Sequence, residues 1–411
     1  MSTAAATRTE TVRMTALERR ATLALASISG LRMLGMFIVL PVFALFAETL
    51  PGGRDRTLVG IALGAYGLTQ AVLQVPFGWA SDKWGRRPVI YSGLALFALG
   101  SFIAAGAPTI GWTIVGRAVQ GTGAVSAAVI ALASDLTRDA VRTRAMAVIG
   151  ITIATTFAVS LVAGPLLGAA IGVPGIFALT GFLALAAIAV VRFAIPDPPE
   201  LTQAKRAPTR AAFRRVLGDP NLLRFNYGIF ALHALFMALF IEMPFALRDN
   251  GVGGDRQWMV YLPVIVLAGA SMWPFARAAD QPGRGKAVFV GAVGTLLVAQ
   301  VVLAFGLHSL PALVTGLLLF FAAFNLLEAM LPALVSRYAP AELKGSAVGV
   351  YASVQFLGVF VGAAFGGWLV QHAGPAAVFG FGVALTAIWL AVGATMAAPP
   401  THRSTFSMGE T

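Results

Sequence analysis

Long apolar runs, separated by short polar or basic segments, dominate the amino-acid sequence. A helix of about 20 apolar residues crosses a hydrocarbon core that is about 30 Å thick. Twelve runs meet this length, and we expect all of them to be helical because backbone groups in lipid must bond to one another. The predicted spans are 22–46, 59–80, 89–107, 110–132, 146–171, 175–191, 222–247, 258–275, 287–307, 310–335, 348–370 and 378–396.

A proline-rich and then basic segment interrupts this pattern after Ile195. Such a segment is typical of a boundary between structural units. We therefore predict an amino-terminal bundle at 21–195, a linker at 196–221 and a carboxy-terminal bundle at 222–397, with tails at 1–20 and 398–411. Residues 211–217 fit a short amphipathic helix on the membrane surface or a solvated loop, and the loop is favoured.

Two short sequence patterns in the first half recur in the second half at an offset of 198 positions. The first repeat consists of an acid, a glycine and an arginine, and the second consists of two glycines in the fifth and eleventh spans. The first set is Asp82, Gly85 and Arg86 with Asp280, Gly283 and Arg284, and the second is Gly164 and Gly168 with Gly362 and Gly366. Because six spans separate the copies, we predict two pseudo-symmetric six-helix bundles related by an axis along the membrane normal.

Composition agrees with an all-α integral membrane protein, because 58% of the 411 residues are hydrophobic and only 11% are charged. The net charge of +12 is explained by membrane orientation. Lysine and arginine gather in the loops on the side of the termini, whereas the opposite loops hold only Arg54, Arg56, Arg248 and Arg256. This asymmetry predicts cytoplasmic termini, and it makes a nucleic-acid partner unnecessary.

The chain has no cysteine and only four histidines, which lie far apart in sequence. We therefore expect no disulfide, no metal site and no cofactor. The polar amino terminus carries arginines up to Arg20, so no removable signal peptide is expected. No nucleophile, base and acid pattern supports a membrane hydrolase, and we predict that the protein is not an enzyme.

Four charged residues or histidines lie well inside predicted spans, away from the span ends, and each costs about 2.5–3.5 kcal/mol at a helix centre. They are Arg32, Arg117, His233 and Glu328. Such residues mark ion or substrate pathways, so we take them as candidate proton and substrate sites. Glu242 falls at the predicted outer interface, where we expect it to be solvated.

Glu328 is our first candidate for the proton carrier, and the alternative is a permanent ion pair with Arg32. For His233, a hydrogen-bonded structural role is favoured over titration. Arg117 either binds or repels coupling charge, or it pins the first helix to the fourth. Two amides lie three positions from these charges, Gln120 from Arg117 and Asn325 from Glu328, so each pair is predicted to line a polar cavity.

The segment G-W-A-S-D-K-W-G-R-R-P at 78–88 is the most informative motif. Gly78 permits close helix approach, and Gly85 permits a tight turn. An acid at Asp82 is stabilised by a facing helix amino terminus or by a cation, while Arg86 and Arg87 supply fixed positive charge. The alternative interpretation is an orientation signal with a tight turn, although orientation requires neither the acid nor both glycines.

These residues resemble the loop signature of the major facilitator superfamily, G-x-x-x-D-x-x-G-R-[RK], at every consensus position. Residues 116–121 resemble the fourth-helix arginine motif of this family. Gly164, Pro165 and Gly168 resemble the fifth-helix antiporter motif, although Ser160 and Ala169 replace its usual glycines. The chain is similar to the YajR group of bacterial drug/proton antiporters, but only about fifteen polar residues follow the last span, too few for the soluble domain that members of that group can carry.

The resemblance implies a conformational lock at the cytoplasmic ends of the helices. We define the predicted lock as Gly78, Asp82, Gly85, Arg86, Arg87 and Asp135. By analogy, Asp82 faces the start of the eleventh helix near Pro340, and Arg86 reaches Asp135. The cluster is expected to hold the cytoplasmic ends together in the outward-facing state and to release them in the inward-facing state.

The predicted function is a proton-driven antiporter that exports small organic compounds, as a monomer, across the bacterial inner membrane. Its partners are the substrate, protons and the lipid bilayer. Alternatives are a metabolite or sugar carrier, including a symporter, and a non-transporting membrane sensor. Apolar candidates for the pocket are Met33, Met36, Phe37, Phe236 and Trp389, although such residues more often face lipid or the helix core.

Overall fold

The computed structural model describes residues 13–196, 210–279, 281–340 and 343–396, which contain fourteen α-helices and no strand. The first half comprises α1 (Ala16–Phe37), α2 (Leu40–Ala47), α3 (Arg56–Trp84), α4 (Arg86–Ala105), α5 (Ile110–Gly121), α6 (Ser126–Asp135) and α7 (Asp139–Ala194). α8 (Arg210–Gly218) leads into the second half. That half comprises α9 (Pro220–Asp249), α10 (Trp258–Ala279), α11 (Gly285–Phe305), α12 (Leu310–Tyr338), α13 (Lys344–Ala373) and α14 (Pro375–Ala394).

These helices provide twelve membrane crossings, as predicted. Eleven apolar segments of the described chain are long enough to span a bilayer. One of them, α7, has 56 residues and holds the predicted fifth and sixth spans, which Gly172 separates with its positive φ of 68°. The predicted first and fourth spans are each divided into two helices, α1 with α2 and α5 with α6.

The first helix begins six residues before the predicted start, at Ala16. The reason is a capping box, in which the Thr15 side chain accepts from the Glu18 amide and the Glu18 side chain accepts from the Thr15 amide. The linker also differs from the favoured interpretation, because residues 210–218 form the helix α8 and not a loop.

The glycines with positive φ confirm that the two halves share one architecture. In the described chain there are six of them, and they form three pairs that lie 198–202 positions apart. The pairs are Gly52 with Gly251, Gly85 with Gly283, and Gly172 with Gly374. Each pair marks equivalent turns, because only glycine adopts this conformation without strain. Asp280, the predicted counterpart of Asp82, lies outside the described residues.

The fifth and eleventh crossings also pack in equivalent ways. A Cβ atom on Gly164 would lie 2.5 Å from the Ile38 carbonyl oxygen, and one on Gly362 would lie 2.1 Å from the Ala234 carbonyl oxygen. Such contacts require glycine, because any side chain would separate the helix backbones. Pro165 follows Gly164 and is buried within α7. The shared packing explains why these glycines repeat in the sequence.

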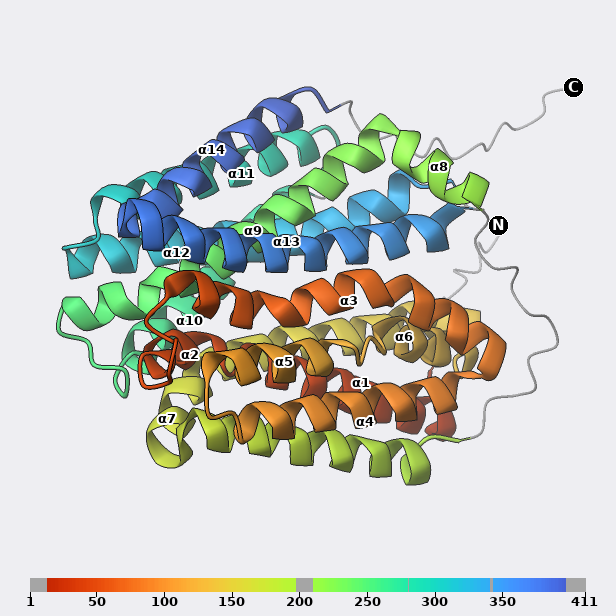
Figure 1. Cartoon of the computed structure of the whole chain (residues 1–411). Helices are drawn as coiled ribbons and strands as arrows, with labels where there is room; N and C mark the ends of the chain where they lie inside the picture. Colours follow the sequence, from red (N-terminus) through yellow and green to blue (C-terminus); the bar gives the residue numbers. More distant parts are fainter. Residues whose placement is uncertain (1–12, 197–209, 280, 341–342, 397–411) are drawn as a thin grey trace, which may run out of the picture.

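The two halves lie beside one another (Figure 1), with α3 to α7 in the lower part of the view, α9 and α11 to α14 in the upper part, and α8 at the right. They meet mainly where α3 packs along α13, and also where α7 meets α10 and α2 meets α9. Glycines 60, 64 and 67 of α3 bring its backbone against α13. The closest contact therefore involves the first half of α3.

Towards the end of α3 the two halves diverge. At Gly78, the nearest atom to an added Cβ is the Cβ of Ala127 on α6, at 3.6 Å. The expectation that Gly78 lets a neighbouring helix approach closely is therefore wrong for this conformation. The helix then ends at Gly85, whose φ of 96° confirms the predicted tight turn. We call the end of the bundle that carries this turn the basic end.

Candidate functional site

A cavity of about 2670 Å³ lies between the two halves. It reaches from Asp82 and Lys344 at the basic end to Arg117 and His233 in the interior, and both halves contribute to its wall. At the basic end it is accessible to solvent, because the lining residue Asp139 has an 88% exposed side chain. The cavity is therefore a chamber that opens towards one end of the molecule.

Arg32 forms part of the amino-terminal wall of this cavity. The residue is only 4% exposed, and its Nη1 donates to the Tyr66 hydroxyl at 3.3 Å. Its Nη2 also donates to the Ser126 hydroxyl. In the described chain Arg32 makes no ion pair with Glu328, so the predicted alternative of a permanent pair is wrong for this conformation.

Arg117 lies on the same wall and is 2% exposed. Its Nη2 donates to the Leu63 carbonyl oxygen at 3.4 Å, and its Cζ lies 5.1 Å from the centre of the Tyr66 ring. Arg117 therefore joins α5 to α3, and the alternative in which it pins the first helix to the fourth is wrong for this conformation.

Gln120 does not line the cavity as predicted. It accepts from Arg117 Nη1 at 2.7 Å and donates to the Ser101 hydroxyl at 2.9 Å, and it is fully buried. The three-residue spacing correctly predicts that Arg117 and Gln120 share one helix face, but Gln120 points towards α4 and not into the cavity. Gln120 therefore positions the Arg117 guanidinium through a hydrogen bond.

The carboxy-terminal wall carries a polar group made of Glu328, Gln355 and His233. Gln355 Nε2 lies 3.4 Å from Glu328 Oε1 and 2.8 Å from His233 Nε2. His233 Nε2 lies 3.9 Å from Glu328 Oε2, and its Nδ1 lies 3.3 Å from the Ile229 carbonyl oxygen. Asn325 also lines the cavity, one turn from Glu328, as predicted. Gln355 was not predicted, because it lies 27 positions from Glu328 and 122 positions from His233 in the chain.

Aromatic rings from both halves meet in the interior of the cavity. Phe157 lies 5.0 Å from Phe37 and 5.5 Å from Phe236, and Phe236 lies 5.1 Å from Phe324, measured between ring centres. Phe37 and Phe236 were predicted, whereas Phe157 and Phe324 were missed. Trp389 does not line the cavity, because it is buried beside Phe289 and Gly228 within the second half.

The other two apolar candidates, Met33 and Met36, line the cavity on α1. Together with the aromatic rings they make its interior mostly apolar. A wall of this kind suits an organic compound, because polar groups at a few points orient the ligand while apolar contacts supply affinity.

At the basic end, Arg86 is held between two carboxylates. Its Nε lies 3.1 Å from Asp135 Oδ2, which is the predicted contact, and its Nη1 bonds to Asp82 and to the Ser81 hydroxyl. Arg87 bonds to the Ile195 carbonyl oxygen at the end of α7. Among the residues that the structure describes, Asp82 makes no bond to α13, so the predicted contact with that helix is absent in this conformation.

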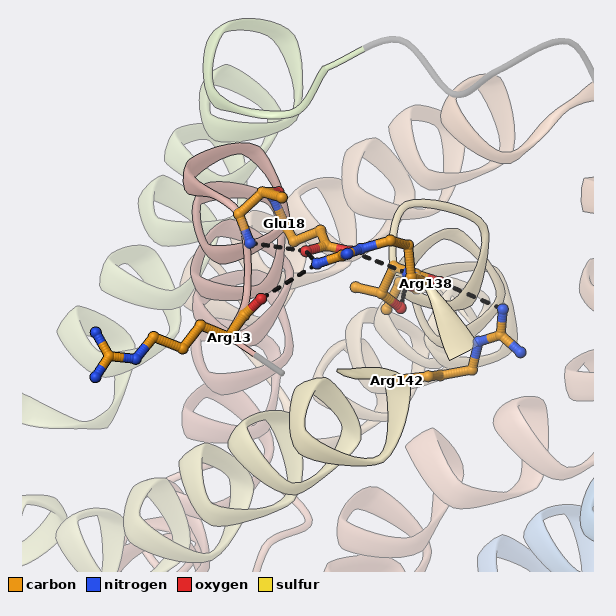
Figure 2. A network of polar contacts seen from close by, with 7 residues as sticks. Arg13, Glu18, Arg138 and Arg142 are labelled. Atoms are coloured by element: carbon orange, nitrogen blue, oxygen red, sulfur yellow. Dashed lines mark hydrogen bonds and ion pairs between the residues drawn. The ribbon is translucent and has the colours of Figure 1, made fainter. Parts of the chain in front are cut away.

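A second polar network at the basic end ties α1 to the turn between α6 and α7 (Figure 2). Arg138 Nε lies 2.8 Å from Glu18 Oε1, and Arg138 Nη2 donates to Glu18 Oε2 at 3.0 Å and to the Arg13 carbonyl oxygen at 3.2 Å. The Glu18 carboxylate raises the pKa of Arg138, so this pair stays charged. The network joins α1 to the start of α7 within the first half, and no pattern in the sequence indicated it.

At the opposite end, an ion pair between Glu48 and Arg248 joins the two halves. Glu48 bonds to Arg56 at 3.0 Å and to Arg248 at 2.9 Å. The Arg56 guanidinium lies 3.4 Å from the centre of the Phe245 ring, and its amide donates to Gln371 Oε1 at 2.8 Å. We call these five residues the outer cluster. Arg248, Phe245 and Gln371 come from the second half, so the cluster links the two halves.

Glu242 lies in α9 near this cluster and is only 5% exposed, so the expectation that it is solvated is wrong. The reason is that most of α9 is covered on all sides, because residues 228–229 and 231–247 are all buried. Glu242 does not line the cavity. It therefore offers a buried carboxyl group that can be compared with Glu328.

Comparisons with known proteins agree with this architecture. The sequence profile described as the Major Facilitator Superfamily matches residues 25–272 and 254–410. The chain is 45% identical over 389 residues to the inner membrane transport protein YajR of Escherichia coli K12, which covers 94% of this chain and 86% of that protein. It is 34% identical over 161 residues to the class G tetracycline resistance protein of Vibrio anguillarum, 39% of each chain. The crystal structure of a D-xylose-proton symporter superposes with a TM-score of 0.71 at 15% identity, covering 92% of this chain and 98% of that one.

Proposed function

Because the chain belongs to the Major Facilitator Superfamily and is a multi-pass membrane transporter, we propose that it is a proton-driven antiporter that exports small organic compounds. The proposed location is the bacterial inner membrane, where the YajR relative resides. The observation that carries the proposal is Glu328, a carboxyl group that lines a largely apolar chamber between two halves.

The basic residues orient this chamber. Loops at the basic end hold most of the lysines and arginines, and such loops remain in the cytoplasm. The basic end and both termini are therefore cytoplasmic, and the chamber opens inward. In this orientation the outer cluster faces the periplasm and closes the chamber on that side.

Transport then requires two closures that alternate. In the inward-facing conformation the outer cluster is formed, while Asp82 and Arg86 line the open mouth. In the outward-facing conformation the outer cluster separates, and the predicted lock brings Asp82 to the start of α13. Each state is stabilised by charges at one end, so a ligand that binds the two states differently shifts their populations.

Glu328 is the proposed proton carrier because a carboxyl group in the chamber holds either a proton or a cationic group of the substrate. Its polar neighbours include Gln355 and His233, which are neutral or weakly basic, and its Oε2 has no hydrogen-bond partner in the described chain. A carboxyl group free of a permanent counter-ion can exchange protons with whichever side the chamber faces.

The contact between Arg86 and Asp135 predicts energetic coupling across the basic end. We expect the variant Arg86→Gln/Asp135→Asn to lose less transport rate than the sum of the two single losses, with a coupling energy of about 0.5–3 kcal/mol. The measurement is initial transport rate in proteoliposomes containing matched amounts of protein. Strictly additive losses would show that the two side chains act independently.

The outer cluster predicts that Glu48→Gln favours the outward-facing state, because both Arg56 and Arg248 lose their shared carboxylate. The pairs are partly exposed, so we expect a shift of about 1 kcal/mol, or about fivefold in population. Since the chain has no cysteine, a single Met33→Cys in the chamber reports access to a membrane-impermeant thiol reagent. Labelling from the periplasmic side should rise about fivefold.

The matched control for Glu48→Gln is Asp255→Asn, which removes an exposed acid at the same end of the molecule. This change should leave labelling at the parental rate. An unchanged rate in Glu48→Gln as well would mean that the cluster does not hold the chamber closed.

The proposed function is tested by transport in proteoliposomes with an imposed pH gradient. Tetracycline is a first probe because a partial relative is a tetracycline resistance protein, and ethidium and D-xylose are the second and third. An antiporter accumulates a probe in the acidic compartment and loses this ability when the gradient is collapsed. Accumulation together with protons would establish the alternative, a symporter, and overturn the proposal.

A further inference from the structure

We propose that the chamber selects zwitterionic organic compounds, which carry an anionic group and a cationic amino group on one small apolar body. The inference rests on the proposed function, because it names the substrate class of the same chamber. It is carried by the unequal charge of the two walls. Arg32 and Arg117 belong to the first half, whereas Glu328 belongs to the second.

The amino-terminal wall has two positive charges without a counter-ion. In the described chain, Arg32 and Arg117 form no ion pair, and their hydrogen bonds go only to neutral oxygens. Arg117 Nε is buried and has no hydrogen-bond partner among the described residues. A guanidinium stays protonated, and a buried charge without a partner is costly, so an anionic group of a ligand is strongly favoured here.

The carboxy-terminal wall suits the opposite charge. Glu328 contributes the acid, and Gln355 and His233 surround it with neutral polar atoms. A substrate ammonium group that binds Glu328 competes with the proton for the same oxygens. Antiport requires this competition, because the substrate must displace the proton before the transporter changes from the inward-facing to the outward-facing conformation.

One small molecule can touch both walls. Tyr66 contacts Arg32 through its hydroxyl and Arg117 through its ring, and its ring centre lies 6.4 Å from that of Phe356 on α13. Phe356 directly follows Gln355, which bonds to Glu328. The contact between Tyr66 and Phe356 therefore joins the cationic wall to α13, the helix that carries Gln355 beside the acidic wall.

Ligands with a single charge fit this arrangement less well. A simple cation is repelled by the two arginines, which outnumber the acid. A simple anion satisfies the arginines but stabilises the protonated form of Glu328, so it would bind together with the proton and oppose exchange. A zwitterion meets both walls and remains compatible with proton release.

The test uses four derivatives of one skeleton that differ only in charge. They are L-phenylalanine, L-phenylalaninamide, N-acetyl-L-phenylalanine and N-acetyl-L-phenylalaninamide, and the equivalent tryptophan series provides a second size. Binding to the purified full chain in detergent is measured by calorimetry at slightly acidic pH. We expect the zwitterion to bind about tenfold more tightly than either singly charged form. A preference for a singly charged or neutral form, or no binding of either zwitterion at about 10 mM, overturns the proposal.

Two variants of Arg32 distinguish a role in recognising the anionic group of the ligand from a role in folding. Arg32→Gln should move the preference from the zwitterion to the cationic amide, whereas Arg32→Lys should keep the zwitterion first. The matched control is Arg256→Gln, an exposed arginine at the opposite end that lines no part of the chamber. An unchanged order of preference in Arg32→Gln contradicts the assignment of the anionic group to this wall.

The binding assay contains no proton gradient, so it can fail separately from the proposed function. If zwitterions bind but move no protons in proteoliposomes, the substrate class stands and antiport is wrong. If only a simple cation drives proton exchange, antiport stands and the zwitterion assignment is wrong.

Discussion

Replacement of Glu328 by glutamine is expected to abolish uphill, proton-driven export while substrate exchange down a gradient continues. Glutamine keeps the shape of the side chain and can still bond to Gln355, but it cannot carry a proton. The chamber, its aromatic rings and both closures remain in place. The expected result is therefore loss of coupling, with accumulation against a gradient falling to the background of empty liposomes. The measurement is substrate accumulation under an imposed pH gradient, compared with counterflow in the same proteoliposomes.

Glu242→Gln is the matched control, because Glu242 is a buried carboxyl group that does not line the chamber. It should retain uphill export. If Glu328→Gln still moves protons at the parental stoichiometry, Glu328 is structural, and His233 becomes the leading carrier. Loss of coupling in both variants would show that removing a buried acid outside the chamber has the same effect, which contradicts a specific role for Glu328.

The second large effect is expected for Asp82→Asn, which should reduce turnover about tenfold, equivalent to about 1.4 kcal/mol, without preventing membrane insertion. The orientation of the inserted protein depends on the number of lysines and arginines in the cytoplasmic loops, and this change leaves that number the same. Turnover depends on the balance between the two states, and Asp82 is proposed to stabilise the outward-facing one. The measurement is exchange rate per inserted molecule, with insertion determined by proteolytic mapping of the loops.

Asp139→Asn supplies the comparison for Asp82→Asn, since Asp139 also lines the mouth at the basic end but is 88% exposed and pairs with Arg142 one turn away. Its turnover should stay close to that of the parental protein. Parental exchange in Asp82→Asn would mean that the motif is only an orientation signal with a tight turn.

The number of crossings and the twofold repeat were predictable because both depend on local sequence. Bilayer thickness sets the length of each apolar run, and a positive φ selects glycine at each equivalent turn. The interruptions within the first and fourth crossings were not predictable. At the first, the break at Ile38 lies where Gly164 of α7 packs against the helix backbone, a tertiary contact that no local pattern contains.

The residues of the chamber were only partly predictable, because tertiary contacts decide which helix face lines it. Intramembrane charge identified Arg32, Arg117, His233 and Glu328 because each is costly in lipid. Helical spacing was correct for Asn325, yet it failed for Gln120, whose bond to Ser101 on α4 turns it away from the chamber. Spacing states which residues share a face but not which neighbour that face meets.

Pairs that are distant in the chain were not found from the sequence. Glu18 and Arg138 are 120 positions apart, and Glu48 and Arg248 are 200 positions apart. Charged residues in loops are numerous, so many pairings are equally consistent with the sequence. The conformation was not predictable either, because Asp82 and Arg86 line an open mouth here and are proposed to form the lock in the other state.

The central claim is that substrate and proton compete for Glu328 in the inward-facing chamber. The most direct test is proton release when a binding compound is added to purified, protonated protein in lightly buffered detergent solution, followed with a pH indicator. We expect about one proton to be released per bound substrate from the parental protein, and none from Glu328→Gln. Binding of the substrate without proton release from the parental protein, or equal release from Glu328→Gln, would contradict it.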